Sequence, residues 1–166
     1  LAMEEYQPPR SRVLGLLALA AALGVLVFSL LLWFQLRTVR PLDPADYPET
    51  LPDFTFSANC TQVGNHLELT GRMGVRGEWY TSFDGRIVLY LAETDTYWMV
   101  PTAMDEQAAF DSELVEKTWG ESYGGFEARL PLSALDADPS QYELCVAWRS
   151  NGHNALVHTG QMLEVE

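Results

Sequence analysis

The feature that most constrains this chain is an uninterrupted apolar segment near its N-terminus. Residues 13–36 read VLGLLALAAALGVLVFSLLLWFQL, and none of these 24 positions carries a charged side chain. As an α-helix the segment would extend about 36 Å, which exceeds the roughly 30 Å hydrocarbon core of a bilayer. Trp33 and Phe34 lie near one end, where interfacial aromatic residues are common. The segment therefore predicts a transmembrane helix at residues 13–36, with membrane lipid around it.

A cleaved secretory signal is the alternative interpretation of this segment. Small residues at Ala18, Ala20 and Ala22 resemble a cleavage site. However, the apolar stretch of a signal peptide runs to only about 7–15 residues, and here residues 25–32 continue the apolar run past any such site. The length therefore favours an uncleaved membrane anchor.

The orientation of the anchor depends on the arginines that flank it. Arg10 and Arg12 precede the segment, while Arg37 and Arg40 follow it, so the positive-inside rule gives a tie. Residues 1–12 form a short tail, whereas the long downstream region is acidic and almost free of lysine, which makes it easy to translocate. We expect a single-pass protein of the cell membrane, with a cytoplasmic tail and its C-terminal domain outside the cytoplasm.

Charge is distributed unevenly along the chain. The net charge is -13, and from Pro41 onward 21 Asp and Glu residues face only six Lys and Arg residues. Acidic surfaces repel phosphate backbones, and affinity for nucleic acid rests largely on basic residues that release counterions. The composition therefore excludes DNA or RNA as a partner.

The rest of the chain predicts a linker followed by an all-β domain. Residues 37–53 are rich in proline, which is typical of a short, semi-rigid spacer. Residues 54–166 alternate apolar and polar positions between clusters of Gly, Asn, Asp and Pro, as half-buried strands and turns do. This pattern predicts an immunoglobulin-like sandwich of about seven strands, at residues 54–60, 67–75, 87–92, 97–100, 126–132, 142–148 and 156–165. Residues 102–122 read as a long loop with one helical turn near 112–117, and Gly160 is a natural place for a β-bulge.

Part of this domain resembles a known fold family. Leu135, Pro139, Tyr142, Leu144 and Val146 occur in the order L...P..Y-x-L-x-V, which resembles the corner before the penultimate strand of fibronectin type III and immunoglobulin-like domains. In those domains a tyrosine hydroxyl bonds back to the chain just upstream.

The wider order of motifs is similar to that of small ectodomains in anchored envelope proteins of Gram-positive bacteria. These motifs are RIVLYL, YWMVPT, YGGFEARLPLSAL and TGQMLEV. The resemblance spans roughly residues 54–165. It implies a fold and a location, and it assigns no functional residue.

Loop aromatic residues are the candidates for a binding surface. Trp79, Tyr80 and Phe83 lie in one Gly-flanked loop, and Trp119 and Tyr123 lie in another. On a rigid scaffold such residues stack on sugars or anchor a protein partner. The alternative is that they close the ends of the sandwich as part of its core.

The two cysteines, Cys60 and Cys145, could form a disulfide in an exported domain. The alternation of inward and outward side chains along the two strands argues against this disulfide. Cys60 follows the inward positions of its strand, whereas Cys145 shares a face with Glu143 and is directed outward if Tyr142 points inward. Side chains on opposite faces do not reach the short Cβ separation that a disulfide needs.

The sequence contains no arrangement that predicts catalysis or metal binding. His66, His153 and His158 lack the HExxH or paired Cys/His spacing of a zinc site, so we expect surface histidines, no metal site and no cofactor. No GxSxG or SxxK motif is present for a nucleophile, and no pair among the many carboxylates stands out for glycoside hydrolysis.

These features predict a non-enzymatic binding or assembly module that contacts another protein of the cell envelope. Two alternatives stay open. The first is a carbohydrate-binding module for cell-wall polysaccharide, which requires Trp79, Tyr80, Trp119 or Tyr123 to be exposed. The second is an envelope hydrolase, which requires a cleft with a strongly perturbed pair of carboxyl groups.

Overall fold

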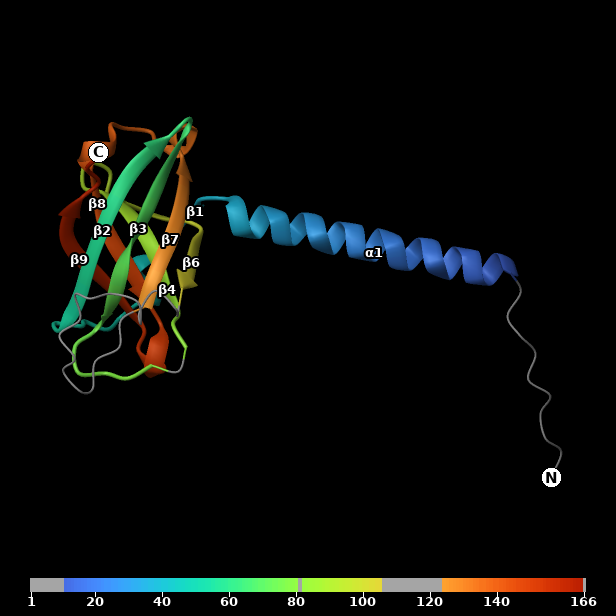
Figure 1. Cartoon of the computed structure of the whole chain (residues 1–166), viewed down its shortest axis with the longest axis horizontal. Coiled ribbons are helices and arrows are strands. Elements are labelled where there is room, and N and C mark those ends of the chain that lie inside the picture. Colours follow the sequence, from blue (N-terminus) through green and yellow to red (C-terminus); the bar gives the residue numbers. More distant parts are fainter. Residues whose placement is uncertain (1–10, 81, 106–123, 166) are drawn as a thin grey trace, which may run out of the picture. The chain divides into compact units, whose positions relative to one another are not determined.

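A computed structural model of the chain describes residues 11–80, 82–105 and 124–165 (Figure 1). The chain divides into two compact units between Arg37 and Thr38. The first unit contains one helix. The second unit, called the β unit below, contains all the strands that the structure describes.

Helix α1 (Ser11–Arg37) is continuous and contains the apolar segment (Figure 1). It is rich in leucine and alanine, which are strong helix formers. The side chains of residues 13–34 are all exposed and none of them is charged, so the helix presents an apolar surface around its whole circumference. By length and composition Val13–Phe34 is suited to cross a membrane, and a signal sequence meets the same two criteria.

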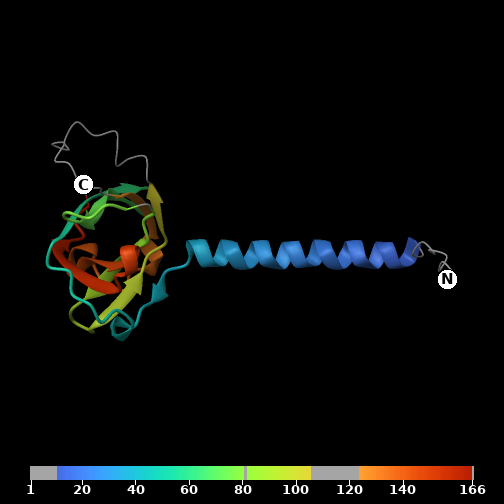
Figure 2. The same ribbon diagram turned by 90° about the horizontal axis from the view of Figure 1, so that it is seen from below.

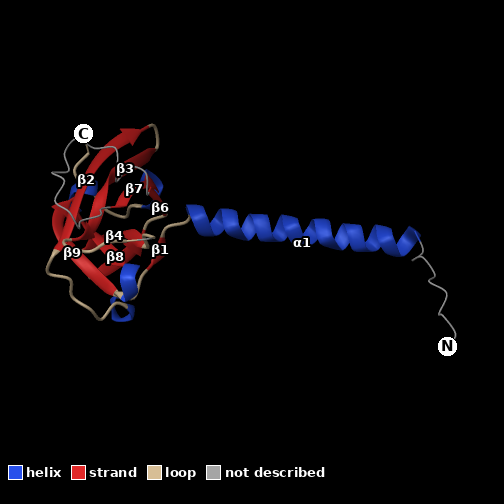
Figure 3. Cartoon of the chain, turned by 60° about the horizontal axis from the view of Figure 1, so that its bottom comes forward, coloured by secondary structure: helices blue, strands red, loops and turns tan. Residues whose placement is uncertain are grey.

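The β unit consists of two antiparallel sheets. The five-stranded sheet has the order β1-β5-β4-β8-β9, and the four-stranded sheet has the order β2-β3-β7-β6. Short 3-10 helices connect some of the strands in the described part of the unit (Figure 3). The strands are β1 (Arg40–Pro41), β2 (Phe54–Val63), β3 (His66–Val75), β4 (Gly85–Leu91), β5 (Thr96–Met99), β6 (Thr102–Asp105), β7 (Gly124–Pro131), β8 (Tyr142–Trp148) and β9 (Ala155–Met162).

Alternation along the strands determines which side chains enter the core. In β3 the odd-numbered apolar residues Leu67, Leu69 and Met73 are fully buried, and the strand continues to Val75 on the same face. Gly71 lies between them because a Cβ there would overlap the carbonyl oxygen of Ser57 in the adjacent strand. Each large apolar side chain that is fully buried contributes about 1.5–3 kcal/mol relative to exposure.

Both sheets contribute to one hydrophobic core. Leu67 and Leu130 of the four-stranded sheet belong to the same buried cluster as Ile87, Leu144 and Trp148 of the five-stranded sheet. Seen from below in Figure 2, the strands of the β unit surround this interior.

The five-stranded sheet also carries a second apolar cluster on its outer face. The buried members of this cluster are Tyr47, Val88, Cys145 and Ala147. The expectation of one hydrophilic face on every half-buried strand is therefore wrong for β8, where both faces are covered. The covering residues include Leu42 and Tyr47, which come from the segment before β2.

Residues 37–53, predicted to be a spacer, do not form a free linker. Pro41 pairs with Trp98 of β5, and the backbone N–H of Leu42 donates to the Tyr97 carbonyl at 2.9 Å. Tyr47 is buried. The prolines restrict the local backbone, but Leu42 and Tyr47 supply the apolar side chains that attach the segment to the sheet.

The strand count also differs from the expected seven, because nine strands lie in the described part of the chain. The two additional strands are β1, from the predicted linker, and β6, from the predicted loop at residues 102–122. Short pairings of this kind depend on a neighbouring strand and have little sequence pattern of their own. The helical turn expected near 112–117 lies outside the described residues.

Candidate functional site

The loop that joins β3 to β4 presents Trp79 to solvent. Trp79 exposes 61% of its surface, which is unusual for so large an apolar residue. Asn151 holds the loop from outside, since its Nδ2 donates to the Trp79 carbonyl oxygen at 3.1 Å. The indole is therefore displayed from a backbone that is anchored to a distant part of the chain.

Glu78, next to Trp79, connects several segments. Tyr80 donates its hydroxyl to Glu78 Oε2 at 2.7 Å, and Asn151 Nδ2 donates to the same oxygen at 3.2 Å. His153 Nε2 lies 2.7 Å from Glu78 Oε1, and its Nδ1 lies 3.4 Å from Glu49 Oε2. This network, called the His153 network below, joins three segments that are far apart in sequence.

The charges of the His153 network shift the pKa values of its members. Burial alone would raise the pKa of Glu78, but hydrogen bonds from Tyr80, His153 and Asn151 lower it overall. The hydrogen bond to Glu78 raises the pKa of His153, with a smaller contribution from Glu49. Each shift favours the charged form of its group, as expected where an imidazolium lies beside a carboxylate.

The other loop aromatics have different positions from Trp79. Tyr80 is buried, and its ring packs edge-on against Trp148 with centroids 5.3 Å apart. Phe83 is half-buried and lies 5.1 Å from the Tyr80 ring. These two residues therefore close the end of the core. Trp119 and Tyr123 lie outside the described residues.

A second polar group lies on the outer face of the five-stranded sheet. His158 Nδ1 is 3.4 Å from Cys145 Sγ and 3.1 Å from Glu143 Oε2. The other ring nitrogen, Nε2, is 3.4 Å from the hydroxyl of Tyr97. Glu143 Oε1 accepts a hydrogen bond from the backbone N–H of Gly160 at 2.9 Å. We call Glu143, Cys145 and His158 the outer-face triad.

A β-bulge brings the members of the triad together. The register between β8 and β9 shifts between Leu144 and Cys145, so Leu144 pairs with Gln161 while Cys145 pairs with His158. Gly160 lies in this bulge with φ of 72°, a left-handed conformation that glycine adopts without strain. The bulge expected at Gly160 is therefore confirmed, and it places His158 beside Glu143 as well as Cys145.

The two cysteines are free, and they belong to different apolar clusters. Cys60 lies in the core shared by the two sheets, whereas Cys145 lies in the outer cluster and is completely buried. Burial raises the pKa of both thiols, and the nearby carboxylate of Glu143 raises that of Cys145 further. Both thiols are therefore protonated near neutral pH.

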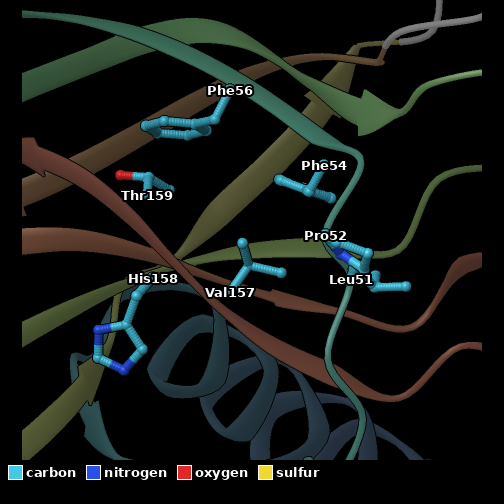
Figure 4. Close-up of a pocket in the computed structure, with 7 residues that line it drawn as sticks. All are labelled: Leu51, Pro52, Phe54, Phe56, Val157, His158 and Thr159. Carbon is cyan, nitrogen blue, oxygen red and sulfur yellow. The ribbon is translucent and has the colours of Figure 1, made fainter.

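A cleft of 340 Å³ lies beside the edge strands β2 and β9 (Figure 4). Phe54, Phe56 and Val157 supply apolar lining, and Figure 4 shows the imidazole of His158 pointing away from Phe56. Nearby, Gln161 bridges the two edges, since its Nε2 donates to the Ala58 carbonyl at 2.6 Å. The cleft thus has both apolar and polar lining, and the imidazole of His158 on its rim contacts the other two members of the triad, Glu143 and Cys145.

Comparison with known proteins adds no assignment. No protein family, curated protein or solved structure matches this chain. The roles of its residues therefore follow from their chemistry and geometry.

The outer-face triad is the arrangement that sequence reasoning missed. Glu143 and Cys145 are two positions apart and so share one face of a strand, which the alternation does indicate. His158 lies 13 positions beyond Cys145, and nothing in the local pattern specifies that it pairs with that residue. A register two residues away would have placed a different side chain there.

Proposed function

We propose that the chain is a membrane-anchored, non-enzymatic module that binds another protein of the cell envelope. In this proposal residues 13–36 hold the chain in lipid, and residues 54–166 form an immunoglobulin-like sandwich outside the cytoplasm. The partner would contact the tip of the β unit around Trp79.

The observation that carries the proposal is the exposure of Trp79 on an anchored loop. Exposed tryptophans are enriched among the residues that dominate binding energy at protein interfaces. Order in the free state matters as well, because a loop that is already fixed loses less conformational entropy on binding. Asn151 and the His153 network supply that order through contacts to Glu78 and to the backbone at Trp79.

Charge indicates the kind of partner. Residues 41–166 carry 21 acidic and six basic side chains. A basic surface on the partner would be attracted over long range, which accelerates association and excludes acidic competitors. We therefore propose a partner that has an apolar pocket for the indole and a basic rim around it.

Tyr142 supports the immunoglobulin-like arrangement. Its hydroxyl accepts hydrogen bonds from the backbone N–H groups of Asp136 and Ala137, at 3.1 and 3.2 Å. A tyrosine that bonds back to the chain a few residues upstream is a recurrent feature of such sandwiches. The shared core of the two sheets is in keeping with the same arrangement.

Carbohydrate binding is the second candidate, and Trp79 favours it too, because an indole also stacks on sugar rings. Platforms of this kind commonly need more than one exposed ring, and Tyr80 is buried. The envelope hydrolase has less support. The carboxyl groups with clearly shifted pKa values in the described residues, Glu78 and Asp138, are shifted downward, so neither serves as a general acid at neutral pH.

The test is purification of the full-length protein from its native membrane in mild detergent, as wild type and as Trp79→Ala. We expect a stoichiometric protein partner with the wild type and a loss of at least about tenfold in affinity with the variant. Val63→Ala is the matched control, because Val63 is also an exposed apolar residue, at 53%, and is expected to bind normally. Wall polysaccharide retained in place of a protein would move the assignment to carbohydrate binding.

The orientation is tested separately. Protease added outside intact cells should remove the β unit if that unit lies outside the cytoplasm. Complete protection in intact cells, with digestion after lysis, would contradict the proposed orientation.

A further inference from the structure

The outer-face triad has no part in the proposed binding surface, and its chemistry points to a different ligand. We propose that Glu143, Cys145 and His158 bind one Zn²⁺ ion through Oε2, Sγ and Nδ1. The three donor atoms already lie within 4.8 Å of one another.

The donor types fit zinc better than the other common cations. Thiolate sulfur, imidazole nitrogen and carboxylate oxygen are the three protein ligands that Zn²⁺ takes, usually in a tetrahedral arrangement. Calcium and magnesium take oxygen ligands, and only Glu143 supplies one here. A mixed set of this kind on two adjacent strands therefore selects against the hard cations.

The distances also fit. With Zn–S near 2.3 Å and Zn–N and Zn–O near 2.0 Å, tetrahedral ligands lie roughly 3.3–3.6 Å from one another. His158 Nδ1 is 3.4 Å from Cys145 Sγ and 3.1 Å from Glu143 Oε2. The third separation, between Cys145 Sγ and Glu143 Oε2, is at most 4.8 Å.

The neighbours of the ligands hold them in the required orientation. The Tyr97 hydroxyl lies 3.4 Å from Nε2 of His158, so with Nδ1 bound to the metal the Nε2–H would donate to the tyrosine oxygen. Gly160 donates its backbone N–H to Glu143 Oε1, which leaves Oε2 for the metal. The ring of Tyr90 packs edge-on against His158 with centroids 5.1 Å apart and restricts its rotation. Partners of this sort accompany most histidine and carboxylate ligands of zinc.

The fourth position of the ion would be open to solvent. The side chains of His158 and Glu143 are 44% and 19% exposed, while Cys145 forms the buried floor. Water would complete the tetrahedron. Binding would release the thiol proton of Cys145 to solvent, because the thiolate is the form that coordinates zinc.

A nucleophilic Cys145–His158 pair is the competing interpretation of these contacts. A reactive cysteine is at least partly exposed and has a lowered pKa. Cys145 is completely buried, and its pKa is raised by burial and by Glu143. The same thiol remains a suitable zinc ligand, because a bound cation favours deprotonation where it is directly coordinated.

The experiment uses the full-length chain in detergent, stripped of metal with a chelator and titrated calorimetrically with zinc chloride. We expect one ion per chain, accompanied by proton release. His158→Gln should weaken zinc binding at least about 100-fold, since removal of a ligand exceeds the 10–100-fold loss typical of outer partners. Tyr97→Phe, which removes such an outer partner, should weaken it about tenfold.

Cobalt provides a readout of the sulfur ligand. Co²⁺ bound by the wild type should show a sulfur-to-metal charge-transfer absorption, and Cys145→Ser should lose it. Because Cys145 is buried and its substitution could impair folding, the exposed His158→Gln is the decisive variant, with circular dichroism to verify its fold. The matched controls are His66→Gln and Cys60→Ser, which are expected to bind zinc as the wild type does.

Two results would overturn the proposal. The first is zinc affinity in His158→Gln equal to that of the wild type. The second is wild-type binding so weak that magnesium or calcium displaces it at equal concentration, which would mean general attraction to acidic side chains.

Discussion

Two histidines of the β unit lie beside acidic groups, and they differ in how their neighbours approach the ring. His153 has Glu78 at Nε2 and Glu49 at Nδ1, so its two carboxylates lie on opposite sides of the imidazole. His158 has both Glu143 and Cys145 at Nδ1. Groups on opposite sides can only clamp the ring, whereas groups at one nitrogen can share an ion with it.

Residue type alone does not define a site, since both histidines lie beside carboxylates and yet have different arrangements. The clamp at His153 joins loops and orders the segment that displays Trp79. The convergence at His158 depends on a bulge between two adjacent strands. The first arrangement is suited to stabilising a surface, and the second to holding a small ligand.

The largest expected difference between the two histidines is in zinc-dependent stability. At a free zinc concentration about 100 times the dissociation constant, a bound ion stabilises the folded state by about 2.7 kcal/mol. We expect this gain for the wild type and for His153→Gln, and about 0.4 kcal/mol or less for His158→Gln, whose affinity is at least about 100-fold weaker. Thermal unfolding of the three proteins with and without zinc measures it, and equal gains in all three would remove the distinction between the sites.

The next largest expected effect is on the contribution of the His153 network to stability in the absence of metal. Glu78→Gln keeps the size of the side chain but removes the charge that Tyr80, Asn151 and His153 contact. We expect a loss of about 1 kcal/mol in the free energy of unfolding, since hydrogen bonds to partly buried charged groups contribute about that much or more. Urea titration measures the loss, and Glu127→Gln, at an exposed strand position, is the control with little change.

A smaller effect is the pH dependence of the stability that the His153 network contributes. The pKa of His153 is raised, so its contribution is fully present below about 6.5, the ordinary histidine value, and is lost as pH rises through the raised value. The pKa of Glu78 is lowered, so its contribution is present above about 4.3 and is lost as pH falls through the lowered value. The stability difference between wild type and His153→Gln should therefore be greatest between about pH 4.3 and 6.5.

The free energy of unfolding of the wild type and of His153→Gln, measured across pH, tests this predicted pH dependence. A difference that grows as the solution becomes alkaline would contradict the assignment of His153 as a cation held by Glu78. A difference that is flat from acid to alkaline pH would mean that the two groups do not interact as an ion pair.

The smallest expected effect on stability is that of replacing Glu49, the more exposed carboxylate of the His153 network. The side chain of Glu49 is 47% exposed and lies 3.4 Å from His153. Exposed ion pairs contribute about 0–1 kcal/mol, so Glu49→Gln should cost less than Glu78→Gln. Equal losses in the two variants would mean that the clamp is shared evenly between its carboxylates.

Much of the fold could be predicted from local pattern. The continuous apolar run indicated helix α1, and the alternation at Leu67, Leu69 and Met73 indicated a strand with one buried face. The bulge at Gly160 also followed from residue type. What failed was the role of the segment around Leu42 and Tyr47, because its contacts are with strands far along the chain.

The candidate site was less predictable than the fold. Trp79, Tyr80 and Phe83 have the same aromatic character and lie within five positions, yet only the first is exposed. Burial of Tyr80 results from the position of Trp148, which is 68 residues away. The local sequence of a loop therefore does not predict which distant side chain will pack against it.

The sequence by itself determined the apolar segment of bilayer length, the acidic character of the β unit and the faces of its main strands, since each is a property of neighbouring residues. Tertiary structure alone decided the register that places His158 beside Cys145, the packing of residues 38–53 on the sheet and the exposure of Trp79. The reason is physical. Periodicity acts over a few residues, whereas register and burial depend on pairings between segments whose separation along the chain leaves no local pattern.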